Sequence, residues 1–418
     1  MQSKIYFNKV LSIFIIVFAA LFVNNFCHSE GNRIKQENKS VENYSKIFAD
    51  YRLTSMQDRV VNASGKLHWF LPTDNSDFPR LILYNESELL VKYGYQYQIF
   101  KDKNLVVKGD CDFGTNIIFS EQSVLFSENA TVKEFDRKNQ EEKDLCVVPD
   151  IISESIWKCI YKFDENIFIQ ILNRASEESN LVFPKHDDNT SNQDDNSDKS
   201  ILMVIDSNQK VRWRKEFNGE SLQSIILTES KQVLSFYYED PYSNSISVFD
   251  LETGRELNKI KVEKAAVINA SLDFNNQLNV ILHTSDNELL LRNYSLQGNV
   301  NWEYSFSVTE VKSISQPPAI NKMNQVFCII NNMLYGIENG RLIFETNLLD
   351  DNSFKFVTIT GDNNIIVCTS YMLSYFKEDG TLIFNFILEP TEKITTPVVI
   401  DENGLIYFGS TKGIYSLK

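Results

Sequence analysis

Short apolar runs separated by polar turns repeat along the C-terminal half of the chain. Residues 397–409 hold two apolar runs on either side of the polar turn Asp401–Gly404. Residues 357–367 and 318–327, about 40 and 80 positions earlier, show the same arrangement. An apolar alternation broken by a polar turn is typical of a β-hairpin. The pattern therefore predicts hairpins that recur about every 40 residues.

A second hairpin follows each of these, and it carries an aromatic residue four positions after its turn. A regular step of this size, with four strands per step, is typical of the blades of a β-propeller. The turns fall at 209, 254, 298, 340 and 380, so the steps are 45, 44, 42 and 40 residues. The copies are Gln209 with Trp213, Gly298 with Trp302, Gly340 with Phe344 and Gly380 with Phe384, while Gly254 is followed by Asn258 where the aromatic is expected.

The last turn of the series would fall near position 420, beyond Lys418. A matching segment, Gly65-Lys-Leu-His-Trp69, stands near the other end of the chain. A propeller avoids exposed sheet edges by closing its ring, so an N-terminal strand is expected to complete the last blade. Residues 79–110, 112–150 and 151–221 predict three further blades. The fold class is thus all-β, an eight-bladed β-propeller over residues 61–418, or a seven-bladed one if the first two early blades are a single unit.

Composition agrees with this fold class and limits the partners. The 418 residues exceed the roughly 250–300 that one hydrophobic core can serve, so several domains or repeats are required. The 29 Phe and 18 Tyr suit half-buried strands better than amphipathic helices. The formal net charge of −15 opposes binding to phosphate backbones, and nucleic acid is not an expected partner.

The first 29 residues are typical of a secretory signal peptide. Lys4 and Lys9 precede an uncharged apolar run from Val10 to Val23, which is short for a membrane span of about 20 residues. We expect cleavage before Glu30 and export, to the periplasm or cell envelope if the source is bacterial and by secretion otherwise. The alternatives are lipidation at Cys27, for which Phe26 is a poor preceding residue, and an uncleaved N-terminal anchor. Membrane contact is expected only through such an anchor.

Two polar segments lie outside the repeat. Residues 30–60 lack a clear period and predict a polar extension, with a short helix near 41–51 as an alternative. Residues 184–199 predict a disordered loop inserted in the third blade, because Asp, Asn and Ser dominate it. Its alternating acids resemble a calcium loop but lack the turn glycine and terminal glutamate of an EF-hand.

The sequence contains no recognisable active site. It has no GxSxG elbow, no HExxH and no P-loop, and its six cysteines contain no CxxC pair. Cys328 and Cys368 lie in strand patterns and are expected to be buried as small apolar residues. We therefore predict no catalytic, cofactor-binding or metal-binding residues and no cofactor.

The turn-and-aromatic repeats resemble the PQQ-like (quinoprotein-type) propeller repeat family, whose repeat ends close to Ala-x-Asp-x-x-Thr-Gly-Lys-x-x-Trp. Asp250-Leu-Glu-Thr253-Gly254-Arg255 matches the centre of that pattern, and Ser64 to Trp69 matches its end. The resemblance covers about residues 61–418. It implies a propeller whose structural repeat positions include Gly65, Trp69, Trp213, Gly254, Gly298, Trp302, Gly340, Phe344, Gly380 and Phe384.

Two functions remain from this resemblance. The nearest functional analogy is the propeller lipoprotein of the outer-membrane β-barrel assembly machinery, which implies a non-catalytic, exported scaffold that binds a protein partner. The alternative is a small-ligand or quinone- and metal-binding propeller with oxidoreductase activity. In quinone-dependent dehydrogenases of this fold, adjacent cysteines form a disulfide over the cofactor, and no two cysteines are adjacent here. We therefore expect the scaffold and not an enzyme.

Overall fold

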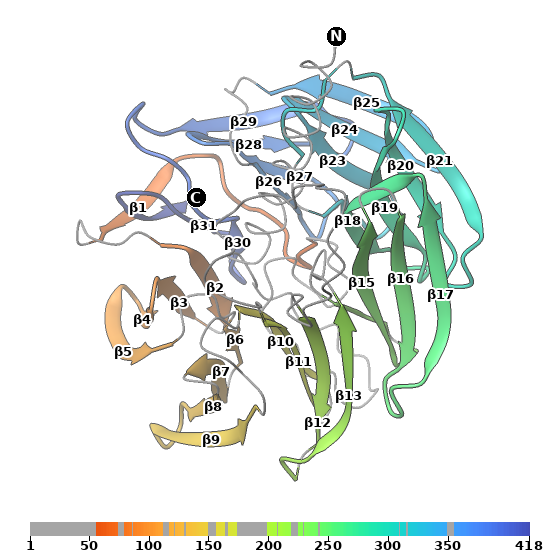
Figure 1. Cartoon of the computed structure of the whole chain (residues 1–418). Coiled ribbons are helices and arrows are strands. Elements are labelled where there is room, and N and C mark those ends of the chain that lie inside the picture. The colour runs from red at the N-terminus through yellow and green to blue at the C-terminus, as the bar shows by residue number, and fades with distance from the viewer. Residues whose placement is uncertain are drawn as a thin grey trace, which may run out of the picture.

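The computed structural model describes residues 56–418 except for 74–78, 86, 112–116, 121, 129–130, 149–155, 164–165, 174–198, 207, 219–224, 229, 241–242, 309, 315–316 and 349–354. The predicted signal peptide, Cys27, the helix near 41–51 and nearly all of the loop at 184–199 lie outside the described residues. Across these described residues the structure is all-β and has no helix (Figure 1).

The described strands form eight four-stranded antiparallel sheets, which we number from the N-terminal side. Sheet 1 contains β2 (Leu81–Asn85), β3 (Glu88–Tyr93), β4 (Gln96–Lys101) and β5 (Asn104–Asp110). Sheet 2 contains β6 (Ile118–Phe119), β7 (Ser123–Glu128), β8 (Thr131–Asp136) and β9 (Glu141–Val147). Sheet 3 contains β10 (Ile156–Phe163), β11 (Asn166–Asn173), β12 (Lys199–Ile205) and β13 (Val211–Asn218). Sheet 4 contains β14 (Ile226–Leu227), β15 (Gln232–Asp240), β16 (Ser243–Asp250) and β17 (Glu256–Glu263).

Three further sheets follow in the second half of the chain. Sheet 5 contains β18 (Ala265–Leu272), β19 (Leu278–Thr284), β20 (Leu289–Tyr294) and β21 (Val300–Phe306). Sheet 6 contains β22 (Ala319–Ile320), β23 (Val326–Ile330), β24 (Met333–Glu338) and β25 (Arg341–Asn347). Sheet 7 contains β26 (Phe356–Ile359), β27 (Ile365–Cys368), β28 (Met372–Phe376) and β29 (Leu382–Ile387). Figure 1 shows the sheets following one another around a common centre.

Sheet 8 joins the two ends of the described chain. It has the order β1 (Leu67–Pro72), β32 (Gly413–Leu417), β31 (Ile406–Gly409) and β30 (Val399–Ile400). In the antiparallel pair of β1 and β32, Trp69 lies opposite Ser416 and Phe70 lies opposite Tyr415. Lys66 and Lys418 extend the pair at one end through two reciprocal backbone hydrogen bonds. The N–H of Lys66 donates to the Lys418 carbonyl at 3.0 Å, and the N–H of Lys418 donates to the Lys66 carbonyl at 2.9 Å. The N-terminal strand therefore pairs with the segment that the repeat pattern left without an outer partner.

Burial decreases from the inner to the outer strand in the sheets whose side chains are described from end to end. β18 and β26 are buried along their whole length, whereas β25 and β29 alternate between exposed and half-buried positions. Strands enclosed on both faces read as continuous apolar runs, while strands with one solvated face alternate. A continuous apolar run thus indicates an inner strand, and an alternating pattern indicates an outer strand.

Apolar clusters join every sheet to the next one along the chain. Between sheets 1 and 2, for example, the rings of Tyr97 and Phe126 have centroids 5.4 Å apart. The same kind of cluster joins sheet 8 back to sheet 1, through Ile414 of sheet 8 and Ile82 and Val91 of sheet 1. Because each sheet is too small to bury its apolar faces alone, these shared clusters form the core.

Residues 56–66, which we call the N-terminal strap, cross the ends of the inner strands of sheets 7 and 8. Met56 forms a parallel bridge with Ile359, and the buried Gln57 side chain bonds to the backbone of sheet 8. Further along, the backbone N–H of Asn62 donates to the Gly404 carbonyl at 3.1 Å. Residues 56–60 fall in the segment that the sequence indicates as a polar extension, but here they are packed against the sheets.

Candidate interaction surface

Four of the repeated turns touch the aromatic residue of the preceding sheet. Gly254 has a left-handed backbone with φ of +66°, and a Cβ atom there would lie 2.6 Å from the indole of Trp213. The indole Nε1 of Trp213 donates a hydrogen bond of 2.9 Å to the carbonyl oxygen of Leu251 in the same turn. Glycine is needed here for two reasons, the left-handed backbone and the closely packed ring. The turn of sheet 4 is thereby fixed to the outer strand of sheet 3.

The other turn glycines are placed in the same way. A Cβ atom at Gly340 would lie 3.3 Å from Trp302, one at Gly380 would lie 2.5 Å from Phe344, and one at Gly65 would lie 2.5 Å from Phe384. All three glycines have positive φ, from +75° to +83°. The structure therefore brings the repeat residues together in pairs across the boundaries between sheets, and uses them as structural contacts.

At two further boundaries, another pair of residues takes the place of the glycine and the aromatic. Asn258 stands in the aromatic position of sheet 4, and its Nδ2 donates to the Leu296 carbonyl at 2.8 Å in the turn that contains Gly298. At the boundary of sheets 8 and 1, the ammonium of Lys103 lies 5.4 Å from the centroid of Trp69. This is a cation–π contact, and Lys103 takes the left-handed backbone with φ of +69°. The turn at Lys103 lacks a glycine, so the repeat pattern did not reveal it.

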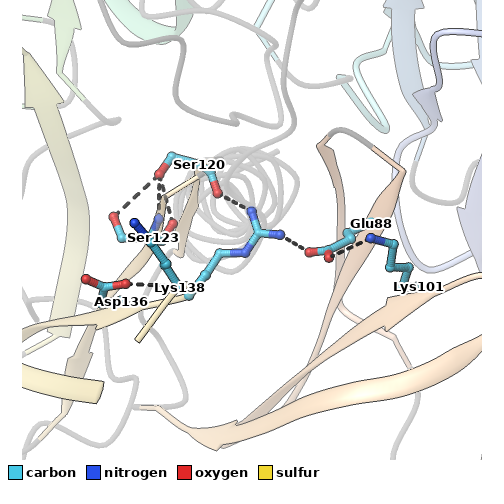
Figure 2. Close-up of polar contacts among 7 residues, drawn as sticks. Glu88, Lys101, Ser120, Ser123, Asp136 and Lys138 are labelled. Carbon is cyan, nitrogen blue, oxygen red and sulfur yellow. Dashed lines mark hydrogen bonds and ion pairs between the residues drawn. The ribbon is translucent and has the colours of Figure 1, made fainter. Parts of the chain in front are cut away.

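In addition to their apolar cluster, sheets 1 and 2 are joined by a polar network around Arg137, which lies directly after β8. Its guanidinium donates to the Ser120 carbonyl at 2.6 Å and forms an ion pair with Glu88 of sheet 1. Figure 2 shows Lys101 on the other side of Glu88, with its ammonium 4.0 Å from the carboxylate. The guanidinium also lies 4.8 Å from the ring of Phe119. These charged residues come together only in the folded chain, so no local sequence motif predicts the network.

The outer strands expose apolar side chains at one repeated position, two residues after the turn. We call these the rim residues, and their exposed fractions range from 41% to 52%. Scattered exposed apolar residues are ordinary, but the same position in successive sheets forms an organised surface. For all of them but Leu105, the signal lay in the sequence, midway between a turn and its aromatic, but the prediction considered only the turn and the ring. The rim residues are Leu67, Leu105, Val211, Val300, Leu342 and Leu382.

Charge is distributed unevenly over the eight outer strands. Six of them, β5, β9, β13, β17, β21 and β25, contain Lys, Arg, Asp or Glu. Charged side chains on an edge strand protect it against pairing with another chain. β29, with the sequence LIFNFI, and β1, with the sequence LHWFLP, contain none of these residues. The two outer strands without charge belong to neighbouring sheets.

An aromatic seam runs between these two strands, made of Phe384 and Phe386 of β29, Phe70 of β1 and Tyr415 of β32. The centroid of Tyr415 lies 4.7 Å from that of Phe70 and 5.8 Å from that of Phe386. Phe70 is 38% exposed. Burial and the hydrogen bond to the Glu392 carboxylate raise the pKa of Tyr415, so its hydroxyl remains protonated at neutral pH. The seam is partly open to solvent.

Buried titratable groups are scattered through the described sheets. Cys328 and Cys368 are buried, as the sequence predicts, and burial raises the pKa of both thiols. Burial also raises the pKa of the Cys146 thiol to about 11 and lowers the pKa of His283. Among the described residues, no three His, Cys, Asp or Glu side chains are grouped closely enough to hold a metal ion. The described part of the chain also contains no helix long and apolar enough to cross a membrane.

The comparisons with known proteins identify the fold. No family model matches the sequence, and no curated protein shows significant similarity to it. Among solved structures, the chain is similar to a europium-containing methanol dehydrogenase, with a TM-score of 0.60 and 8% identity, over 86% of this chain and 88% of that one. It is also similar to the Dos1 propeller, with a TM-score of 0.56 and 10% identity, over 85% of this chain and 96% of that one. At these identities the likeness shows a β-propeller and no more.

Proposed function

We propose that the protein is an exported, non-catalytic β-propeller scaffold that holds a protein partner on its outer wall. The observation that carries this proposal is the organised exposure of apolar residues on the outer strands, together with two neighbouring outer strands that lack charges. Apolar side chains exposed at a repeated position do not stabilise the isolated chain, but a partner that buries them would gain apolar contact.

We also propose that the eight sheets are the blades of one closed ring of the PQQ-like kind. The pairing of β1 with β32 and the apolar cluster shared by sheets 8 and 1 support closure. The contacts between each turn and the preceding outer strand continue through Lys103 and Trp69, which supports the same arrangement. A closed ring is rigid, and a rigid wall preserves the shape of an interaction surface.

The cellular setting remains part of the proposal. The N-terminal segment with Lys4, Lys9 and the apolar run at 10–23 supports export. A role in assembling envelope or outer-membrane proteins follows from the analogy with the propeller lipoprotein. The net charge of −15 favours partners that present basic surfaces.

Native affinity purification of the exported protein tests the proposal. A protein partner should co-purify reproducibly, and it should be lost when two rim residues of neighbouring sheets are replaced, as in Leu67→Lys with Leu382→Lys. Recovery of the chain alone, with no recurring protein, would contradict the scaffold role. The purified variant should keep the unfolding temperature of the wild type, because both side chains are about half exposed.

The alternative is a quinone- or metal-binding propeller with oxidoreductase activity. The fold likeness to a methanol dehydrogenase over 86% of this chain is what keeps it under consideration. A quinone or a metal ion co-purifying in stoichiometric amount, in place of a protein, would favour this alternative. Acid extraction of the purified protein, followed by absorption and elemental analysis, decides between the two.

A further inference from the structure

We infer that the free edge of β29 binds an extended polypeptide segment that is apolar at its centre and basic at its ends, added as a fifth strand to sheet 7. This inference rests on the proposed function and names the site and the chemistry of the partner. Strand addition of this kind obtains its affinity from backbone hydrogen bonds and its selectivity from alternate side chains.

The composition of β29 is the first step. It is the outermost strand of sheet 7, so one of its edges has no neighbour within that sheet. Leu382, Ile383 and Ile387 are exposed by 48%, 44% and 65%, and no charged residue or proline interrupts the strand. An apolar edge without these protective devices is a ready template for another strand. Among the outer strands, β1 shares the lack of charge but ends in Pro72.

The aromatic seam is the second step. Phe384 and Phe386 alternate with exposed residues along β29 and are half-buried toward sheet 8, where Phe386 meets Tyr415. Tyr415 in turn meets Phe70, which is still partly exposed. A strand added beside β29 would therefore place alternate side chains beside this seam, and burying them there would add apolar contact to the backbone pairing.

Charge selects the occupant. Glu378 and Asp379 are exposed in the turn before β29, where Lys377 is also exposed, and Glu389 is exposed just after the strand. An incoming segment with Lys or Arg at both ends would meet acid at each end of β29. A second copy of this chain would not, because antiparallel pairing of two β29 strands would place the Glu378–Asp379 turn of one beside Glu389 of the other. Like charges at both ends oppose that pairing.

Fluorescence anisotropy with a defined peptide tests the inference. The probe is a labelled peptide of alternating valine and threonine with two lysines at each end. Binding to the wild-type protein is expected, and Leu382→Lys and Ile387→Lys should each weaken it at least ~10-fold because a lysine on the edge opposes pairing. The matched controls Val106→Lys on β5 and Val147→Lys on β9 change side chains of similar exposure, 48% and 71%, that are not rim residues, and they add the same charge. They should change affinity by less than about 2-fold, the size expected of a screened distant charge.

Two altered probes separate the two parts of the inference. A peptide with glutamates at its ends should bind at least ~10-fold more weakly if charge selects the partner. A peptide with N-methyl groups on alternate backbone amides should also lose binding if strand pairing is the mode, because it cannot donate those hydrogen bonds. Each variant is checked for an unchanged unfolding temperature before binding is measured.

The failing outcomes are distinct from those of the scaffold proposal. Absence of peptide binding, or equal weakening by the control variants, overturns the β29 site even if a protein partner still co-purifies. Self-association abolished by Ile387→Lys would overturn it as well, because the occupant would then be a second copy. Peptide binding at β29 with no recurring protein partner would instead leave the edge established and contradict the scaffold role.

Discussion

The indole Nε1 of Trp213 and the carbonyl oxygen of Leu251 are joined by a hydrogen bond of 2.9 Å that crosses from one sheet to the next. Asn258 repeats the relationship one sheet further on, because its Nδ2 donates to the Leu296 carbonyl at 2.8 Å. Each donor stands four residues after its own turn, and each acceptor lies in the following turn. The hydrogen bond has thus been kept where the aromatic ring has been replaced.

The first prediction separates the hydrogen bond of Trp213 from its packing. Trp213→Phe removes the donor and leaves the Leu251 carbonyl without it, which should cost about 1–2 kcal/mol. Trp213→Ala also removes a ring that is 8% exposed, and should cost about 3–5 kcal/mol. Urea unfolding followed by hydrogen exchange in sheets 3 and 4 measures both. Equal losses for the two variants would mean that the hydrogen bond alone holds the sheets together.

The second prediction compares two turn glycines that share a left-handed backbone. Alanine should cost roughly 1–2 kcal/mol at either Gly380 or Gly298 for that backbone alone. At Gly380 the new Cβ would also lie 2.5 Å from Phe344, whereas at Gly298 the nearest atom, in Ile260, is 3.6 Å away. We expect Gly380→Ala to be the more destabilising by about 1–3 kcal/mol, because the ring must move. Urea unfolding midpoints provide the comparison.

A double-mutant cycle completes that test. In a background of Phe344→Ala the ring is gone, so Gly380→Ala should cost no more than Gly298→Ala. A penalty that persists in full without the ring would show that the steric contact with Phe344 plays no part.

The sequence predicted the parts of this structure that repeat and missed those that occur once. The turn glycines and aromatics predicted the sheets because each copy supports the others, even where Asn258 replaces the ring. Lys103 and Arg137 carried no such signal, because their partners Trp69 and Glu88 are brought near only where neighbouring sheets pack against each other. Gln57 was assigned to a polar extension, because its acceptor and donor are backbone groups 341 and 343 residues away.

The candidate surface was predictable in part. Five of the six rim residues, all but Leu105, can be found in the printed sequence as an apolar position between a turn and its aromatic. Their exposure could not be predicted, because an apolar residue on a strand is as compatible with burial as with exposure to solvent. The absence of charge from β29 became informative only when the structure identified it as an outer strand beside β1.

The third prediction concerns the N-terminal strap. The buried Gln57 amide donates to the Val398 carbonyl and its oxygen accepts from the Ile400 N–H, both at 2.9 Å. Gln57→Leu leaves both backbone groups buried without these partners, so it should cost about 2–4 kcal/mol. The exposed Asn62→Ala, which loses a hydrogen bond to Asn403, should cost less than about 1 kcal/mol. Thermal and urea unfolding test the pair of variants. If Gln57→Leu costs as little as Asn62→Ala, the strap adds little stability.

The last prediction concerns the pH dependence of stability. His283 is 7% exposed on β19, hydrogen-bonded to Asn287, and burial lowers its pKa below the ordinary value of about 6.5. As the pH falls through 6.5 the unfolded chain takes up a proton that the folded chain does not, so stability falls below that pH and is unaffected above it. His283→Asn should therefore reduce the loss of stability between pH 7 and 5, measured as the shift in urea midpoint. The exposed His68→Asn is the control, because it replaces a histidine at the surface of β1 by the same residue. If both variants show the wild-type slope, His283 does not couple protonation to folding, and the acid sensitivity of this fold arises from its carboxylates instead.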